Sequence, residues 1–356
     1  MRILVTGACG FVGSQILRRL REAGEGWTLM GMDNFCRAGS ELNRPVLRAL
    51  DVTLVHGDVR SASDFESLPA VDWVIDAAAN PSVLAGVDGR TSSRQLVEHN
   101  LGGTVNMLEY CRSRGVGFIL LSTSRVYSIP PMAGLPLRTE GSRFVLDESQ
   151  SLPSGVSAAG VNETFSCAPP LSLYGVSKKA SEDLALEYAA TFKIPVWVNR
   201  CGVMAGAGQF GRPDQGIVAY WIHSWREKRP LKYLGFGGLG HQVRDVLHPA
   251  DLANLLIKQM QSPAAVHPRL GNVSGGLESA FSLAEMSGWC ADRLGYDHAV
   301  ERSGVDRPFD IPWLILDDNR MRHAWDWQPE VSRDAIFEET AAFAEEHPEW
   351  LGVSAA

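Results

Sequence analysis

The chain has 356 residues, which is enough for about two domains. Hydrophobic residues make up 45% of it and charged residues 21%, a balance that is typical of globular proteins and excludes disordered, collagen-like and coiled-coil chains. With 33 Lys and Arg against 41 Asp and Glu, the formal net charge is −8, which argues against a protein that wraps nucleic acid.

No apolar run approaches the roughly 18 residues that span a bilayer, and the N-terminal segment lacks the apolar core and cleavage site of a signal peptide. The six cysteines are scattered, without a CxxC pair or zinc-ligand spacing. His241 and His248 have no obvious third ligand, so we expect ordinary polar roles for them and no metal. These features predict a soluble, cytoplasmic protein with reduced thiols that does not bind a membrane.

Short apolar runs alternate with amphipathic stretches through the first part of the chain. The runs are rich in Val, Ile and Leu, as expected for strands that helices cover on both faces. Apolar residues at helical spacing predict helices over Ser92–Arg114 and Tyr174–Phe192. Alternating strands and helices predict a Rossmann fold, a parallel and doubly wound α/β sheet. The predicted strands are Ile3–Thr6, Thr28–Asp33, Thr53–His56, Trp73–Asp76, Phe118–Ser122 and Val196–Arg200.

Two regions depart from this alternation. Residues 128–170 are rich in Pro, Ser and Gly, and we interpret them as a long insert and a candidate lid over a site. After residue 200 the pattern becomes irregular, which predicts a second, smaller substrate-binding lobe. Five tryptophans of the later chain are expected in the core or at its rim, namely Trp221, Trp225, Trp313, Trp325 and Trp327.

A glycine-rich turn follows the first predicted strand, with Gly7, Gly10 and Gly13 in a GxxGxxG pattern. Such glycines let backbone N–H groups approach a pyrophosphate at a helix N-terminus, although a plain strand–helix turn has the same appearance. Asp33 ends the second strand, where a carboxylate binds the ribose hydroxyls of adenosine and repels a 2′-phosphate, so NAD is favoured over NADP. Asp58 follows the third strand, where it can accept from the adenine amino group.

Tyr174 and Lys178 form a YxxxK motif at the start of a predicted helix, on one helical face. A tyrosine hydroxyl has a reference pKa of about 10 and is a poor base at neutral pH. A nearby ammonium and the positive nicotinamide ring stabilise the phenolate and lower that pKa. We therefore predict that Tyr174 removes an alcohol proton while hydride leaves the carbon for NAD. Lys178 is also expected to hold the nicotinamide ribose.

Together with the segment Leu121–Tyr127 one strand earlier, these motifs resemble the extended short-chain dehydrogenase/reductase family, which includes nucleotide-sugar epimerases and dehydratases. The resemblance implies that Thr123 hydrogen-bonds the reacting hydroxyl and that Asn100 organises the central helix. Asp76 stands where relatives often carry His. The implied NAD-binding residues are Gly7, Gly10, Phe11, Val12, Gly13, Asp33, Asn34, Asp58, Val59, Ala77, Ala78, Ala79, Asn100, Tyr174 and Lys178.

The residues after Thr123 distinguish reactions within that family. Relatives that are sugar-nucleotide 4,6-dehydratases carry Asp-Glu there, an acid and a base for eliminating water. This chain has Ser124 and Arg125, and neither side chain can do that work. The resemblance therefore favours an enzyme that oxidises and re-reduces one carbinol, or that only oxidises it.

Motifs within residues 128–280, among them Gln209-Phe210-Gly211 and Asp214-Gln215-Gly216, resemble the CDP-paratose (CDP-tyvelose) 2-epimerase branch of the family. That resemblance implies inversion of C2 of a CDP-linked hexose through a transient keto sugar. It also implies a homodimer that pairs through the helices predicted over Ser92–Arg114 and Tyr174–Phe192. The implied substrate-binding residues are Thr123, Arg200, Gln215, Arg244 and Arg307, with the last two on the diphosphate.

The predicted organisation is an NAD-binding domain of residues 1–200 plus 242–260, and a nucleotide-sugar-binding lobe of residues 201–241 and 261–356. Two rival hypotheses stay open at this point. One is a 4-epimerase of UDP- or dTDP-sugars, or an enzyme that releases a keto product. The other is a non-catalytic NAD-binding regulatory protein, because a fold alone does not establish activity. The chain lacks the Asn that many 4-epimerases carry near Val203, and Ala205 is smaller than the usual residue.

Overall fold

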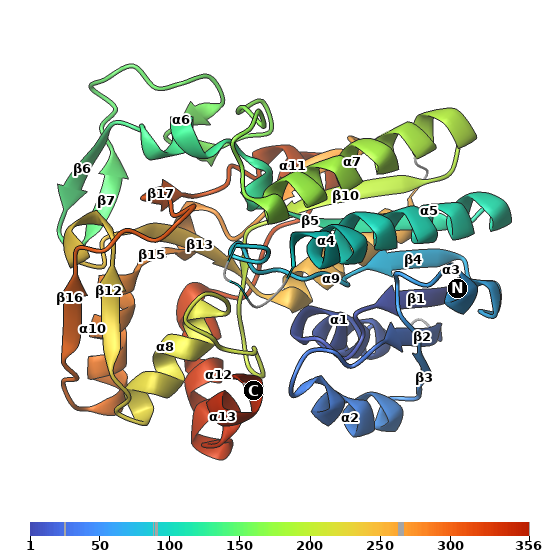
Figure 1. The fold of residues 1–356 in the computed structure, drawn as a ribbon, viewed down its shortest axis with the longest axis horizontal. Coiled ribbons are helices and arrows are strands. Elements are labelled where there is room, and N and C mark those ends of the chain that lie inside the picture. The colour runs from blue at the N-terminus through green and yellow to red at the C-terminus, as the bar shows by residue number, and fades with distance from the viewer. Residues whose placement is uncertain (25, 88, 90–91, 263–266, 356) are drawn as a thin grey trace.

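A computed structural model describes residues 1–24, 26–87, 89, 92–262 and 267–355. Its largest element is a seven-stranded parallel sheet in the order β14-β10-β5-β4-β1-β2-β3. The predicted parallel, doubly wound sheet is therefore confirmed (Figure 1). The strands are β1 Arg2–Thr6, β2 Thr28–Asp33, β3 Val52–His56, β4 Trp73–Asp76, β5 Gly117–Thr123, β10 Val196–Cys201 and β14 Leu270–Val273.

Helices cover both faces of this sheet. One face carries α1 (Phe11–Glu22), α2 (Asn43–Ala49), α9 (Pro249–Gln261) and α11 (Asn319–Trp325). The opposite face carries α3 (Ala62–Glu66), α4 (Ser93–Val97), α5 (Gly103–Arg114) and α7 (Leu173–Phe192).

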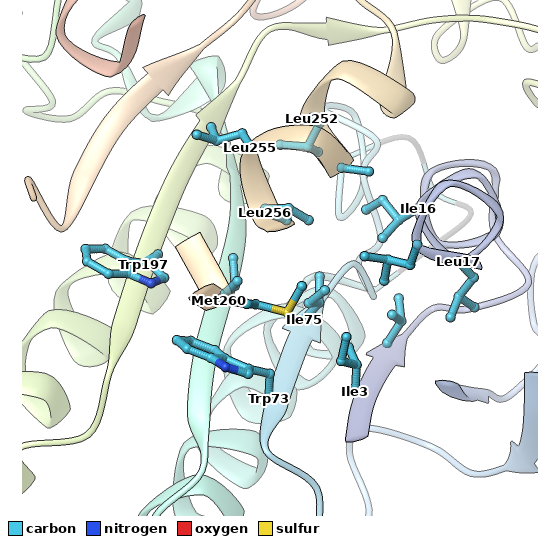
Figure 2. Close-up of a cluster of buried hydrophobic side chains, with 14 of the residues drawn as sticks. Ile3, Ile16, Leu17, Trp73, Ile75, Trp197, Leu252, Leu255, Leu256 and Met260 are labelled. Carbon is cyan, nitrogen blue, oxygen red and sulfur yellow. The ribbon is translucent and has the colours of Figure 1, made fainter. Parts of the chain in front are cut away.

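The hydrophobic core under α1 and α9 explains how the sheet is held. Figure 2 shows Ile3 and Ile75 of the sheet facing Ile16 of α1 and Leu256 of α9. Each of these four side chains is fully buried. Burying a side chain of this size contributes about 1.5–3 kcal/mol, so the apolar strands and the apolar stripes of the helices specify this layer together.

The strand order reverses between β1 and β4, where the chain turns from one side of the sheet to the other. Parallel sheets bind ligands in the crevice outside the carboxyl ends of the strands at such a point. The glycine turn after β1, Asp33 at the end of β2 and Thr123 at the end of β5 all lie at that edge. The fold therefore brings the predicted site residues to one end of the sheet.

All six predicted strands are present, with bounds that differ by no more than a residue at either end. The helix predicted over Ser92–Arg114 is present as an unbroken helical run from Ser93 to Arg114, within which a π-helical turn at Glu98–Gly102 joins α4 to α5. The seventh strand, β14, was not predicted from its short apolar run.

The second part of the chain has its own small sheet, formed by β11 (Val203–Met204), β13 (Val243–Leu247), β15 (Ala280–Ser282) and β17 (Trp313–Leu314). A parallel pair, β12 (Leu231–Leu234) and β16 (Val300–Ser303), lies beside it. The helices are α8 (Ile217–Arg226), α10 (Leu283–Leu294), α12 (Arg333–Glu346) and α13 (Trp350–Ala355). All five tryptophans expected in the core are buried.

Two strands belong to a different sheet from the one that the predicted domain ranges imply. β13 lies within the range assigned to the first domain but pairs in the small sheet, and β14 lies within the range assigned to the second lobe but pairs in the large sheet. The assignment of the two parts to NAD and to a nucleotide sugar stays a prediction.

The insert at residues 128–170 is ordered and packs on the small sheet. It holds α6 (Ile129–Ala133) and the strand pairs β6 (Leu137–Glu140) with β7 (Arg143–Leu146) and β8 (Val156–Ser157) with β9 (Gly160–Val161). Backbone hydrogen bonds from Val161 to Ile315 (2.8 Å) and from Phe144 to His241 (3.0 Å) anchor it. Its role as a lid stays a prediction. No helix of the described residues is long and apolar enough to cross a membrane.

Candidate active site

The glycine turn leaves room for a ligand at the N-terminus of α1. Gly7 has a φ of 61°, and a Cβ on it would lie 2.8 Å from the Ala77 carbonyl oxygen, so only glycine lets the loop after β4 come this close. Gly10, the N-cap residue of α1, has no side chain to bond the first N–H groups of the helix. A Cβ on Gly13 would overlap the Gly7 carbonyl oxygen. Phe11 begins α1 directly after this turn.

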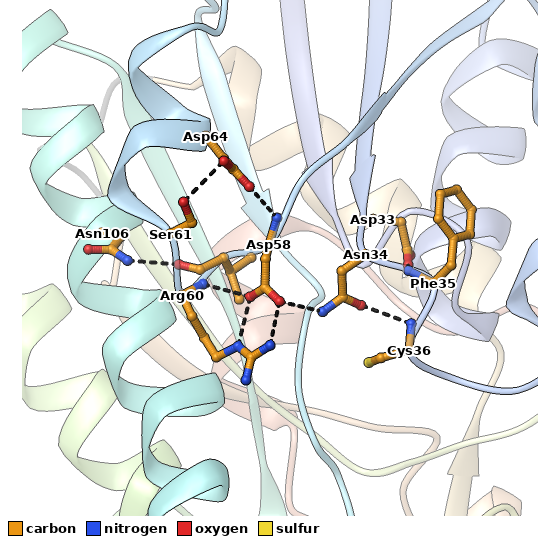
Figure 3. Close-up of polar contacts among 10 residues, drawn as sticks. Asp33, Asn34, Phe35, Cys36, Asp58, Arg60, Ser61, Asp64 and Asn106 are labelled. Atoms are coloured by element: carbon orange, nitrogen blue, oxygen red, sulfur yellow. Dashed lines mark hydrogen bonds and ion pairs between the residues drawn. The ribbon is translucent and has the colours of Figure 1, made fainter.

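The carboxylates expected at the adenosine end lie side by side, as Figure 3 shows. Asp33 accepts from the backbone N–H groups of Cys9 and Phe35, both at 2.8 Å. Asn34 donates to Asp58 at 2.9 Å and so links the ends of β2 and β3. Burial raises the pKa of Asp33, whereas those backbone hydrogen bonds lower it.

Arg60 holds the carboxylate of Asp58 in place. Arg60 Nη2 lies 2.6 Å from Asp58 Oδ2, and Arg60 Nε donates to Oδ1 at 2.9 Å. The hydrogen bond from Arg60 holds the pKa of Asp58 well below its usual range. Val59, which follows, is buried against α5. Asp58 is therefore an ionised, oriented acceptor at the edge of the crevice.

Asn100 fixes the small-residue loop Ala77–Ala79 expected against the nicotinamide. Its side-chain oxygen accepts from Asn80 N at 2.8 Å, and its Nδ2 donates to Asn80 O at 3.2 Å and to Ser177 Oγ at 3.1 Å. Asn100 lies in the π-helical turn between α4 and α5, and such turns are frequent at functional sites. It therefore ties the loop after β4 to α7, as the predicted organising role requires.

Thr123, Tyr174 and Lys178 meet where β5 ends and α7 begins. Ser172 caps α7 by accepting from Gly175 N at 3.0 Å. A Cβ on Gly175 would overlap the Arg125 carbonyl oxygen, so glycine lets the helix start directly against the turn after Thr123. Tyr174 and Lys178 then project from the first turns of α7 and are 8% and 2% exposed.

The phenol of Tyr174 needs positive charge before it can act as a base. Burial raises its pKa to about 12, whereas a hydrogen bond from Thr123 and the charge of Arg125 lower it. Lys178 lies one helical turn from Tyr174 on the same helix. Thr123 and Arg125 thus favour the ionised form of the phenol, but burial has the larger effect and raises the pKa overall.

Asp76 is a buried carboxyl beside this group. It ends β4, is 1% exposed, and accepts from Thr6 Oγ1 at 3.1 Å and from Ala78 N at 3.2 Å. Burial raises its pKa, and the charge of Lys178 lowers it. The ammonium of Lys178 therefore lies within electrostatic range of a carboxylate inside the protein.

Three arginines form a cationic cluster next to Tyr174. Arg244 Nη2 donates to Asp310 Oδ1 at 3.1 Å, and Arg125 Nη1 donates to Phe309 O at 3.1 Å. Arg307 lies within electrostatic range of both guanidinium groups. Phe309 has a left-handed φ of 60°, a strained backbone that is common at functional sites. Asp310 is the acidic partner of these three arginines, so the cluster of arginines and Asp310 carries a net positive charge, which suits a diphosphate.

Comparison with known proteins identifies the family. Residues 3–274 match the model of the NAD dependent epimerase/dehydratase family. The chain belongs to this family. A CDP-paratose 2-epimerase of Salmonella typhi is 28% identical over 340 residues, which are 93% of this chain and 96% of that protein. A dTDP-glucose 4,6-dehydratase of Streptomyces antibioticus is 30% identical over 323 residues, 87% of this chain and 83% of that one.

A solved structure shows the same architecture. The UDP-glucose 4-epimerase of Thermus thermophilus in complex with NAD aligns with a TM-score of 0.75 and 25% identity, over 97% of this chain and 99% of that one. This member of the epimerase/dehydratase family is thus an NAD-dependent enzyme of the extended short-chain dehydrogenase/reductase type. The uncapped helix N-terminus beside Gly7 and Gly10 and the oriented Asp33 carboxylate fit that dinucleotide.

Two predicted substrate-binding residues lie apart from Tyr174. Arg200 on β10 is 4% exposed and points toward α7, where its guanidinium binds Glu182 with Nη2 2.7 Å from Oε2. Gln215 lies on a turn of the second part and binds Arg37. Arg200 and Glu182 form an internal ion pair, while Gln215 contacts the loop after β2.

The supporting residues were missed from sequence. Asn80 and Ser177, which hold Asn100, lie far from it in the chain, and nothing in the local pattern marks them. Arg37 follows Asp33 and Asn34 closely, and a cation soon after the carboxylate predicted to bind ribose was an available signal. His248 caps α9 and lies 3.0 Å from Glu339. The described residues contain no group of three side chains arranged to hold a metal ion.

Proposed function

We propose that this enzyme inverts C2 of a CDP-linked hexose of the CDP-paratose or CDP-tyvelose type through a keto sugar. The observation that carries the proposal is the group of Thr123, Tyr174 and Lys178 beside Ala77–Ala79, with Arg125 where an eliminating enzyme needs an acid or base. Similarity to a CDP-paratose 2-epimerase over 93% of the chain supports the choice of C2 and of cytidine.

The chemistry of the chain's own residues follows from their placement. Tyr174, as phenolate, accepts the proton of the C2 hydroxyl, while Thr123 holds that hydroxyl by a hydrogen bond. NAD held at the glycine turn and Asp33 would supply the oxidation of C2 and the matching reduction of the ketone. The keto sugar presents its opposite face, and Tyr174 then gives the proton back to the C2 oxygen. Arg125 is a permanent cation and offers neither an acid nor a base for elimination at neutral pH.

The diphosphate is assigned to Arg244 and Arg307 in this proposal. Asp310 holds Arg244, so its guanidinium is oriented before substrate binds. Binding energy from this remote anion positions the sugar at Tyr174. Substrate binding by Arg200 and Gln215 stays a prediction. In the structure Arg200 binds Glu182 and Gln215 binds Arg37, so in this proposal they act on the substrate only through those two partners.

Nuclear magnetic resonance of the sugar protons tests the proposal. Purified protein is incubated in deuterated water, without added NAD, with CDP-paratose, CDP-glucose, UDP-glucose and UDP-glucuronate. A C2 epimer of a CDP-sugar without deuterium at C2 is expected, because the hydride returns to the carbon it left. Deuterium at C2 would show proton abstraction from carbon and refute the mechanism.

The alternative is a 4-epimerase of UDP- or dTDP-sugars, which the likeness to a UDP-glucose 4-epimerase structure favours. A C4 epimer in the same experiment would show that the reacting carbon is C4 and not C2, and the proposed roles of Tyr174 and Lys178 would be unchanged. Net NADH formation would instead indicate a released keto product. Absence of turnover with every sugar, although NAD is bound, would favour the regulatory protein.

Tyr174→Phe separates chemistry from cofactor binding. This variant keeps the ring that fills the site and loses the proton acceptor, so we expect turnover to fall by at least about 10³-fold with the NAD content unchanged. Retained turnover in Tyr174→Phe would contradict the assignment of the base. A loss of NAD together with turnover would instead show that the tyrosine serves cofactor binding.

We further propose that the enzyme is a cytoplasmic homodimer. Exposed apolar side chains on α4, α5 and α7 support this, since Val97, Val105, Leu173 and Val176 are each at least 36% exposed. Pairing of these helices with those of a second copy would cover them. Light scattering on the purified protein measures the mass, and a monomer at micromolar concentration would contradict the dimer.

A further inference from the structure

Residues 209–216, which we call the strap, connect β11 to α8 and are anchored to the C-terminal helix α13. Trp350 Nε1 donates to the Gln209 carbonyl at 2.8 Å. The ring of Phe210 stacks on that of Trp350, with centroids 5.3 Å apart. The base of the strap is therefore fixed to the second part of the chain.

The tip of the strap reaches the large sheet at two points. It is a tight turn closed by two backbone hydrogen bonds between Arg212 and Gln215, at 2.6 and 3.1 Å. Gln215 Oε1 accepts from Arg37 Nη1 at 3.0 Å, and Asp214 Oδ2 accepts from Ser82 Oγ at 3.0 Å. Arg37 lies in the loop after β2, and Ser82 lies in the loop after β4. Gln215 and Asp214 at the tip of the strap therefore link these two loops.

The same two loops flank the dinucleotide site. β2 ends in Asp33 at the adenosine end, β4 leads into Ala77–Ala79 at the nicotinamide end, and β1 with its glycine turn lies between them in the sheet. A dinucleotide extended from β2 to β4 crosses the end of β1. Phe210 of the strap packs with Phe11, the first residue of α1 after that turn. The strap thus covers the place where the diphosphate of NAD lies on α1.

Two polar groups in the loop after β2 are left without a partner. Among the described residues, Arg37 Nη2 and Ser40 Oγ are buried and make no hydrogen bond, and Ser40 is 1% exposed. The Arg37 guanidinium also lies over the Phe210 ring, 5.4 Å from its centroid. An arginine offers a planar fork of donors that matches phosphate oxygens. A buried donor that the protein leaves unused beside the glycine turn fits an anionic ligand.

We propose that the strap retains NAD: Arg37 binds the cofactor diphosphate with one arm of its guanidinium and the strap with the other, and the cofactor leaves only when the Arg37–Gln215 and Ser82–Asp214 bonds open. The inference rests on NAD binding and not on which sugar reacts. An epimerase regenerates its cofactor in every turnover, so it gains from keeping NAD bound rather than exchanging it.

The double variant Ser82→Ala/Gln215→Ala opens both contacts of the tip and keeps Arg37. Its matched control is Ser149→Ala/Gln150→Ala, which removes a serine and a glutamine that bind one aspartate, Asp147, in the insert. NADH is loaded on each protein and chased with excess NAD, and its fluorescence gives the dissociation rate constant. We expect that constant to rise about ten-fold or more in the first variant and to stay at the wild-type value in the control. A rise of less than about two-fold in Ser82→Ala/Gln215→Ala would overturn the retention by the strap.

Arg37→Met tests the diphosphate contact separately. Calorimetry compares ADP-ribose, which carries the diphosphate, with adenosine, which does not. We expect Arg37→Met to weaken ADP-ribose about ten-fold or more and to leave adenosine unchanged. An equal loss for both ligands would show a damaged site and overturn the contact, as would unchanged affinity for ADP-ribose. No sugar enters these measurements, so their failure is distinct from failure of the C2 proposal.

Discussion

Replacing Arg125 by methionine is expected to slow turnover by making Tyr174 harder to ionise. Burial raises the pKa of the Tyr174 phenol to about 12, so at pH 8 only about one molecule in 10⁴ carries the phenolate. Ionising it at pH 8 takes about 5 kcal/mol, since one pKa unit corresponds to about 1.4 kcal/mol. The hydrogen bond from Thr123 and the charge of Arg125 already contribute to that value. The Lys178 ammonium and the bound nicotinamide ring are the charges left to supply the rest.

The surroundings of Arg125 indicate how far its charge lowers the pKa of Tyr174. Its side chain is partly buried and held by Phe309 O, and its charge lowers the pKa of Tyr174. In an effective dielectric of about 20, two unit charges roughly 10 Å apart interact by about 1.7 kcal/mol, or about one pKa unit, and we take this as the order of magnitude for Arg125. Loss of the cation raises the pKa, so the phenolate fraction falls about ten-fold at every pH below it.

The assay is the pH dependence of kcat between about pH 6 and 10 for the wild type, Arg125→Met, Arg125→Lys and Arg138→Met. Arg125→Met should lower kcat about ten-fold on the acidic side of the pH profile. The apparent pKa of that profile should rise by about one unit, and KM should change by less than about two-fold. Lysine keeps the charge and should restore most of the rate. Arg138 pairs with Glu140 on the surface of the insert, so Arg138→Met should match the wild type. Below the apparent pKa the loss should be constant, and it should shrink as the pH rises through that pKa, because the phenolate is then fully formed in both proteins. A loss that persists unchanged on the high-pH plateau, or that falls on KM alone, would refute the electrostatic role.

Two further substitutions test the scaffold of the site. Glu182→Gln leaves Arg200 without its charged partner in the core and should lower the free energy of unfolding in urea by about 3–5 kcal/mol; a change below about 1 kcal/mol would contradict that. Gly175→Ala puts a methyl group on the Arg125 carbonyl oxygen and should lower kcat about ten-fold or more with NAD still bound, whereas Gly288→Ala, on an open helix face, should leave kcat unchanged. Wild-type kcat in Gly175→Ala would show that the helix start tolerates a shift.

The parts of this enzyme that the sequence predicts are those with short-range signals. The six strands are continuous apolar runs, and Asp33, Thr123 and Tyr174 each stand at a recognisable strand end or helix start. The π-helical turn that joins α4 to α5 was not predictable, because it leaves the apolar spacing on both sides nearly unchanged. β14 was missed because a strand of four residues that contains Gly271 and Asn272 shows little apolar pattern.

Long-range partners explain the remaining differences. The sequence around a buried arginine does not indicate whether its guanidinium binds a carboxylate of the protein or a substrate. Glu182 lies opposite Arg200 because α7 packs over β10, and Gln215 meets Arg37 because the strap returns to the loop after β2. Neither juxtaposition has a local signal, so the contacts of these arginines required the fold.

The charge of the residue beside Tyr174 then decides between the reactions that this scaffold supports. Arg125 remains protonated at neutral pH, so there it can neither donate nor accept a proton during catalysis. Its guanidinium is bound to the strained Phe309 carbonyl and shares Asp310 with Arg244, which gives the keto sugar cationic neighbours on the diphosphate side. A ketone in such surroundings has no acid or base from Arg125 for elimination. In the proposed reaction this one position favours inversion over dehydration, provided that the cofactor stays bound while the sugar turns over, which is the task we assign to the strap.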